Sequence, residues 1–142
     1  MSTILVVANE TLGGAKLLET IQQKAGPDDR VVVCVPRNRP REGFVIYDDA
    51  VYDAAQVRID LARQFLRERH VNAVGDVGDP DPYTATMNAL ELFRIGDVVI
   101  STLPETRSGW LRADLIERVR RATNIPIEHV VAGQDAPTPQ EA

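Results

Sequence analysis

The chain has 142 residues, a formal net charge of −5 and one cysteine. This length suits a single compact domain. The negative charge argues against nucleic acid as a partner, because binding to phosphates needs many clustered Lys and Arg residues. One cysteine excludes an internal disulfide and fits a reducing cytosol. No apolar run approaches the roughly 20 residues of a membrane span, and the first residues lack a basic segment and a small-residue cleavage site, so we expect a cytoplasmic protein with no signal peptide and no membrane partner.

Short apolar runs predict the strands. Four of them cover residues 4–8, 31–35, 98–100 and 127–131. They are rich in β-branched residues and nearly continuous in hydrophobicity, as is typical of strands that are buried on both faces. A fifth, weaker candidate covers residues 71–77, where Gly75 and Asp76 interrupt the apolar pattern.

Helices are predicted between the strands, because apolar residues recur there at spacings of three and four. The recurring positions are Ala15, Leu18, Ile21 and Ala25; Ala54, Leu61, Phe65 and Leu66; Met87, Leu90 and Phe93; and Leu111, Leu115, Val119 and Ala122. Asp81 suits the N-cap of the third helix, with Pro82 at its first helical position. Alternating strands and helices imply right-handed crossovers and a doubly wound parallel sheet with helices on both faces. We therefore expect one α/β domain over residues 1–132.

Two stretches fall outside this pattern. Residues 36–50 (PRNRPREGFVIYDDA) form a long connection that is rich in arginine, proline and acids. A connection of this length is either functional or a surface loop whose apolar residues pack back on the domain. Residues 133–142 are polar with two prolines, so we expect a disordered tail.

A candidate binding site follows from the fold class. In open doubly wound sheets, ligands bind beyond the carboxyl ends of the strands, where the strand order reverses. The segments expected there supply glycines, helix N–H groups and arginines, which together suit a small anionic ligand. In the alternative interpretation, the arginines pair with nearby acids on a solvated rim. The candidate ligand-binding residues are Asn9, Glu10, Val35, Thr102, Arg107, Ser108, Gly109 and Arg112.

Other chemistry has little support in the sequence. His70 and His129 have no neighbouring metal ligands; we expect the first to end a helix, the second to face out from an edge strand, and no metal site. Cys34 lies within an apolar run and is expected in the core. No phosphate-binding loop motif and no nucleophile with a base at recognisable spacing are present, so we expect no enzyme.

Three stretches resemble the universal stress protein family. ILVVAN, residues 4–9, resembles the family's first strand, and GDPDPYTATMNAL from Gly78 resembles its turn and following helix. RSGWL with LIERVRRATNIPIEHVV resembles its closing segment. The resemblance implies a fold of the adenine nucleotide alpha hydrolase type, with five strands in the order 3-2-1-4-5. It also implies homodimers, for which the last strand, as an exposed sheet edge, is the expected pairing surface.

The resemblance also implies where ATP would bind and why the usual mode is expected to be lost. Family members that bind ATP use an acid after the first strand and a G-x2-G-x9-G-[ST] loop after the fourth. Here Asn9 holds the acid's position, and Leu103 and Thr106 hold those of the first two glycines. Without a gap, the third glycine's position falls on Ile116, beside Glu117; with a deletion of three residues, it falls on Ala113, beside Asp114. The third glycine is missing in either alignment. A carboxylate repels triphosphate oxygens, and Cβ atoms obstruct close backbone approach.

We therefore expect a universal stress protein-like, non-catalytic regulatory or stress-response module. The sequence does not identify a cofactor for it. Its crevice, where Arg107, Ser108 and Gly109 survive from the family's motif, would take another small anionic or nucleotide ligand. One alternative is a homodimeric interaction protein without a ligand. Another is a universal stress protein that binds ATP and hydrolyses it weakly.

Overall fold

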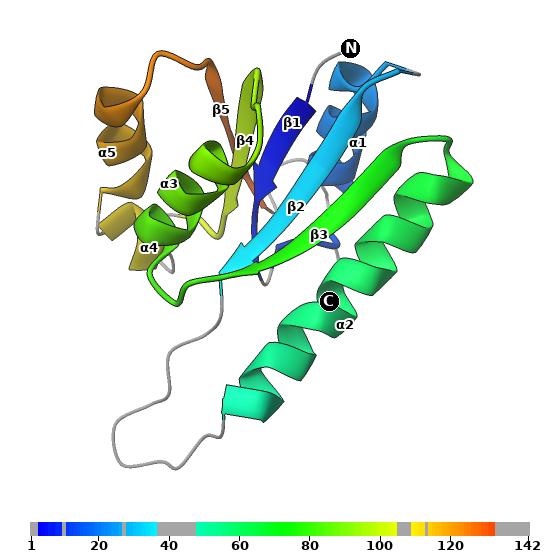
Figure 1. Ribbon diagram of the computed structural model, residues 1–142, viewed down its shortest axis with the longest axis horizontal. Coiled ribbons are helices and arrows are strands. Elements are labelled where there is room, and N and C mark those ends of the chain that lie inside the picture. The colour runs from blue at the N-terminus through cyan, green and yellow to red at the C-terminus, as the bar shows by residue number, and fades with distance from the viewer. Residues whose placement is uncertain are drawn as a thin grey trace.

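A five-stranded parallel sheet in the order β3-β2-β1-β4-β5 forms the centre of the computed structural model (Figure 1). The structure describes residues 3–9, 11–26, 28–36, 48–104, 109–112 and 114–132. The strands are β1 (Thr3–Val7), β2 (Arg30–Pro36), β3 (Asn72–Gly78), β4 (Asp97–Thr102) and β5 (Ile127–Val131). The helices are α1 (Ala15–Lys24), α2 (Asp48–Glu68), α3 (Pro82–Leu92), α4 (Gly109–Arg112) and α5 (Leu115–Ala122). This architecture confirms the predicted fold class and strand order.

β1 is the central strand, with β2 on one side and β4 on the other. Val6 lies opposite Val33 of β2 and Val99 of β4, and all five residues of β1 are buried. Successive side chains of a strand point to opposite faces, so both faces of β1 must be apolar. This requirement explains why the apolar runs in the sequence are continuous rather than alternating.

The two faces of the sheet are covered by different helices. On one face, Ile4 and Val6 belong to a core cluster with residues of α1 and α2, such as Ile21 and Ile59. On the other face, Leu5, Val7 and Ile100 belong to a cluster with residues of α3 and α5. Figure 1 shows this arrangement of helices around the sheet. Within the described part of the chain, no helix combines the length and apolar character needed to cross a membrane.

β3 forms one edge of the sheet, and glycine allows α2 to approach it closely. A Cβ at Gly75 would overlap the side chain of Ile59 on α2. A Cβ at Gly78 would lie 2.8 Å from Cβ of Ala85 and 3.1 Å from Sγ of Cys34. Gly75, which interrupts the strand pattern in the sequence, and Gly78 are therefore both needed for helix packing.

Two helix ends agree with the sequence prediction. Asp81 caps α3, because its carboxylate accepts hydrogen bonds from the backbone N–H of Thr84 at 3.0 Å and from the hydroxyl of the same residue at 2.7 Å. His70 follows α2 with a positive φ of 63°. The N–H groups of His70 and Val71 donate to the carbonyls of Arg67 and Leu66 at 2.9 Å, which is the hydrogen-bond pattern of a Schellman motif.

Two predicted boundaries were wrong. Pro36 pairs with Gly78 in the sheet, and residues 48–50 belong to α2, so the connection predicted over residues 36–50 begins later and ends earlier. The single helix predicted after β4 is divided into α4 and α5, because Asp114 adopts a left-handed conformation with φ of 62°, which an aspartate tolerates. Residues 37–47 and the predicted tail, residues 133–142, lie outside the described part of the chain.

Gly75→Ala tests the close packing of α2 on β3. We expect the free energy of unfolding to fall by about 1–3 kcal/mol, because the added methyl group overpacks against Ile59. Urea unfolding measures this change. Gly13→Ala is the control, since no atom lies within 4 Å of a Cβ at that position; equal effects of the two substitutions would contradict the packing argument.

Candidate functional site

Asn9 joins three elements at the carboxyl end of β1. Its side chain is buried, and its Nδ2 donates a hydrogen bond of 2.7 Å to the carbonyl of Pro36 at the end of β2. Its Oδ1 accepts a hydrogen bond from Nη1 of Arg58 on α2. An amide has one accepting and one donating end, so the contact with Pro36 orients the oxygen toward the guanidinium.

A pair of hydroxyls joins the segment that follows β1 to the carboxyl end of β4. Oγ1 of Thr11 and Oγ of Ser101 are 2.7 Å apart, and both side chains are buried. In a doubly wound sheet, the connections after these two strands leave toward opposite faces, which opens a crevice. The hydrogen bond holds the two walls of this crevice together at its base and satisfies both polar groups.

A second polar pair joins β4 to β5. Oγ1 of Thr102 and Nε2 of His129 are 2.8 Å apart. Burial, with a smaller contribution from the positive charge of Arg120, lowers the pKa of His129 below its ordinary value, which favours the neutral ring. The expectation that His129 faces out from the edge strand was wrong, because its ring lies against β4, where the Thr102 hydroxyl satisfies it.

The structure places five of the eight predicted ligand-binding residues. Asn9, Val35 and Thr102 lie at the carboxyl ends of β1, β2 and β4, and all three are buried. Gly109 begins α4 and is exposed, and Arg112 ends this helix. The other three predicted residues, Glu10, Arg107 and Ser108, lie outside the described part of the chain, as do the arginines of the segment after β2.

Three residues near the carboxyl ends were not predicted: Arg58, Thr11 and Ser101. Arg58 had a weak signal in the sequence, because it interrupts the apolar face of α2 one residue before Ile59. Such a charged residue beside a buried helical position often reaches around the helix to a polar partner. Thr11 and Ser101 had no signal, because they are 90 residues apart and only the fold brings them together.

A pocket of about 300 Å³ lies between the β1–α1 connection and α2. Its apolar wall consists of Leu12, Leu18, Leu61, Ala62 and Phe65. Asn9 and Arg58 form its polar end. No carboxylate of the described residues pairs with Arg58, which donates a hydrogen bond to the neutral amide of Asn9. The pocket is therefore apolar with one positive charge at one end.

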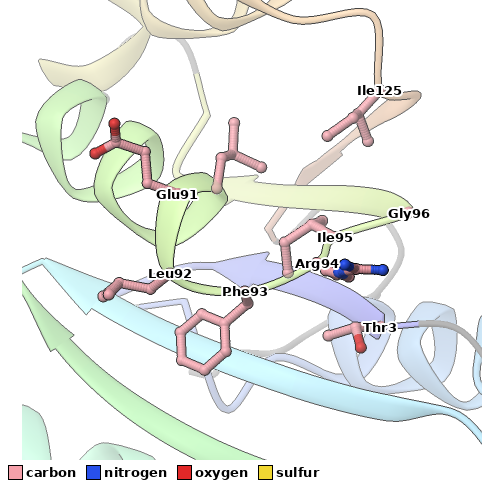
Figure 2. A pocket seen from close by; sticks show the side chains of 9 residues that line it. Thr3, Glu91, Leu92, Phe93, Arg94, Ile95, Gly96 and Ile125 are labelled. Carbon is pink, nitrogen blue, oxygen red and sulfur yellow. The ribbon is translucent and has the colours of Figure 1, made fainter.

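A larger depression of about 850 Å³ lies at the opposite end of the sheet (Figure 2). It is lined by Thr3 at the start of β1, by the segment from Leu90 to Gly96, and by Ile125. Glu91 and Arg94 lie on opposite sides of it (Figure 2). This place is at the amino ends of β1 and β4, away from the switch point at which doubly wound folds bind ligands, so the carboxyl-end groups form the candidate site.

The same fold occurs in solved structures of the universal stress protein family. A family member from Burkholderia pseudomallei matches with a TM-score of 0.64 and 17% identity, over 91% of this chain and 95% of that chain. An Arabidopsis thaliana member with AMP bound matches with a TM-score of 0.62 and 8% identity, over 99% and 98%. A universal stress protein from Archaeoglobus fulgidus matches with a TM-score of 0.61 and 15% identity, over 92% and 93%.

These similarities concern the fold. Neither a protein-family model nor a curated protein matches the sequence, and at 8–17% identity a shared fold does not by itself specify a ligand or an activity. The chain therefore has the α/β fold of universal stress proteins. Among the described residues, no group of three or more His, Cys, Asp or Glu side chains is placed to hold a metal ion.

Asn9→Ala tests the junction at the end of β1. We expect the free energy of unfolding to fall by about 1–3 kcal/mol, because the carbonyl of Pro36 loses a buried donor and Arg58 loses a partly buried acceptor. Chemical denaturation measures this change. Asn88→Ala, at an exposed position of α3, is the control and should change stability by less than about 0.5 kcal/mol; a similarly small effect at Asn9 would contradict the role of the junction.

Proposed function

We propose that this protein is a non-catalytic regulatory module of the universal stress protein type, which binds a small anionic ligand at the carboxyl ends of β1 and β4. The shared fold supports this proposal. In one protein of that fold, from Arabidopsis thaliana, AMP is bound. The proposed ligand is not ATP held in the family's usual manner.

The amide of Asn9 carries the proposal. The family resemblance puts an acid at this position in members that bind ATP. An acid beside Arg58 would form an ion pair and cancel the charge of the guanidinium. Asn9 positions Arg58 through a neutral oxygen, so the positive charge remains for a ligand.

The segment after β4 supports the loss of the usual ATP mode. Leu103, at the position of the first glycine, is half-buried and carries a side chain where the family's motif has none. In the alignment without a gap, Ile116 holds the position of the third glycine. Its side chain is 6% exposed and belongs to the core cluster of α3 and α5. Such a position is part of the packed helix and leaves no open backbone for a phosphate group.

A second candidate function is a homodimer that pairs through β5. β5 is at the edge of the sheet, and β4 is its one neighbouring strand among the described residues. Inward hydrogen bonds run from Ala132 N–H to the carbonyl of Thr102 at 2.8 Å and from Val98 N–H to the carbonyl of Pro126 at 2.9 Å. Because inward and outward groups alternate along a strand, the N–H of Val131 points to the free edge. An unpaired edge of this kind is a surface to which another strand can add.

A thermal-shift measurement tests the proposed ligand class. We expect ATP with Mg²⁺ to leave the melting temperature unchanged. At least one other small anion, from a set of AMP, cyclic nucleotides, inorganic phosphate and simple carboxylates, should raise it, because a ligand that binds the native state stabilises it. If one of these anions binds, Arg107→Ala should weaken that binding. Strong stabilisation by ATP that requires Mg²⁺ would contradict the proposal, and slow ATP hydrolysis abolished by a crevice substitution would favour the enzymatic alternative.

Light scattering tests the dimer. We expect the natural chain to have the mass of two protomers, and Val131→Pro to reduce it to one, because proline removes an outward N–H but no hydrogen bond to β4. Val131→Ala keeps the N–H and should remain dimeric. A natural chain that stays monomeric at high protein concentration would exclude this candidate function.

A further inference from the structure

The pocket between the β1–α1 connection and α2 has a deep apolar floor and a more exposed apolar mouth. Leu12, Leu18 and Ala62 form the floor and are 2%, 8% and 6% exposed. Leu61, at the mouth, is 63% exposed. An exposed leucine beside a pocket leaves apolar surface in water, which an apolar ligand would cover.

The polar end of the pocket is fixed in place. Arg58 reaches from α2 to Oδ1 of Asn9, and Asn9 is fixed in turn by its hydrogen bond to Pro36. One N–H of the guanidinium is used by this contact, and a guanidinium has five. No carboxylate of the described residues pairs with it. Within the described part of the chain, the remaining donors of Arg58 can therefore bind a ligand without first leaving a carboxylate.

The mouth is also held in one arrangement. The guanidinium of Arg69 lies 3.5 Å from the centre of the Phe65 ring, on its face. Nη1 of Arg69 also donates to the carbonyl of Phe65 at 3.2 Å. The cation on one face of the ring restrains Phe65, so little side-chain freedom remains to be lost when a ligand binds.

From these contacts we infer that the pocket binds a small amphipathic monocarboxylate, with its carboxylate on Arg58 and its apolar body along Leu12, Leu61 and Phe65. This inference rests on the proposed anionic-ligand function and names the class of ligand. A carboxylate matches the planar fork of a guanidinium with two parallel hydrogen bonds. The volume of about 300 Å³ is at the small end of the range for ligand pockets.

The pocket suits a carboxylate better than a phosphate. A phosphate group carries close to two negative charges and is strongly hydrated. Among the described residues that line the pocket, Arg58 is the one cation, and Arg69, behind the Phe65 ring, lies 3.9 Å from the carboxylate of Glu68. Placing the second charge against leucine and phenylalanine would remove its water without a compensating partner. A monocarboxylate brings one charge to one guanidinium, and its hydrocarbon body replaces water along the apolar wall.

An NMR titration of the full-length ¹⁵N-labelled chain tests the inference. Sodium octanoate should shift the amide signals of Leu12, Gly13 and Leu61. Hexanoate should bind roughly tenfold more weakly, because it buries two fewer CH₂ groups. Arg58→Gln should weaken octanoate binding about tenfold while leaving the binding of octanol unchanged, because only the carboxylate uses the guanidinium.

Two matched controls separate the site from general effects. Arg67→Gln alters an exposed arginine on the same helix and should leave octanoate binding unchanged. Leu61→Gln should weaken octanoate and octanol alike, whereas Leu92→Gln, at a leucine that is 72% exposed on α3, should affect neither.

Three outcomes would overturn the inference. Octanoate could leave the pocket amides unshifted, or it could bind the Arg58→Gln variant as tightly as the natural chain. Phosphate or AMP could bind through Arg58 while octanoate does not, which would reject the carboxylate but preserve the proposed anionic-ligand function. If octanoate, phosphate and AMP all failed to bind, both proposals would be contradicted.

Discussion

The burial of β1 on both faces and along both edges is the constraint on which the rest of the structure depends. Its five residues are all buried, and its hydrogen-bonding edges are taken by β2 and β4. A strand in this position must be almost entirely apolar. After Thr3 at its start, the next polar side chain is that of Asn9, beyond its carboxyl end. Because the strand order reverses at β1, the connections after β1 and β4 diverge and leave a crevice beside that residue.

The hydrogen bonds at this end of the sheet determine where charge is available. In each of the pairs Thr11–Ser101 and Thr102–His129, the two side chains are hydrogen-bonded to each other. Neither pair carries a net charge while His129 is neutral. The hydrogen bond from Arg58 to Asn9 differs from these pairs, because it fixes a charged guanidinium without neutralising its charge. The result is a positive group beside apolar surface, a combination that water solvates poorly and that an anion with an apolar body would complement.

Fold and site are under different physical requirements, which explains how one can be shared without the other. The fold requires apolar residues of suitable size in its buried strands and on the inner faces of its helices, and many sequences meet this condition. The same fold is accordingly found in universal stress proteins that are 8–17% identical to this chain. A phosphate-binding turn requires glycine at particular positions, which the packing of the sheet does not require. The similarity in fold therefore leaves the ligand to be argued from the site.

The sequence by itself determined the elements and the class of fold, because apolar periodicity, the cap at Asp81 and the end of α2 at His70 depend on neighbours along the chain. It also placed Asn9 at the end of β1. Only the tertiary structure decided what Asn9 contacts: Arg58 is 49 residues away from it. Contacts of this kind depend on how the crossover helices pack on the sheet, and no local pattern in the sequence specifies that geometry. For the same reason, the division of the last helix at Asp114 became visible only in three dimensions.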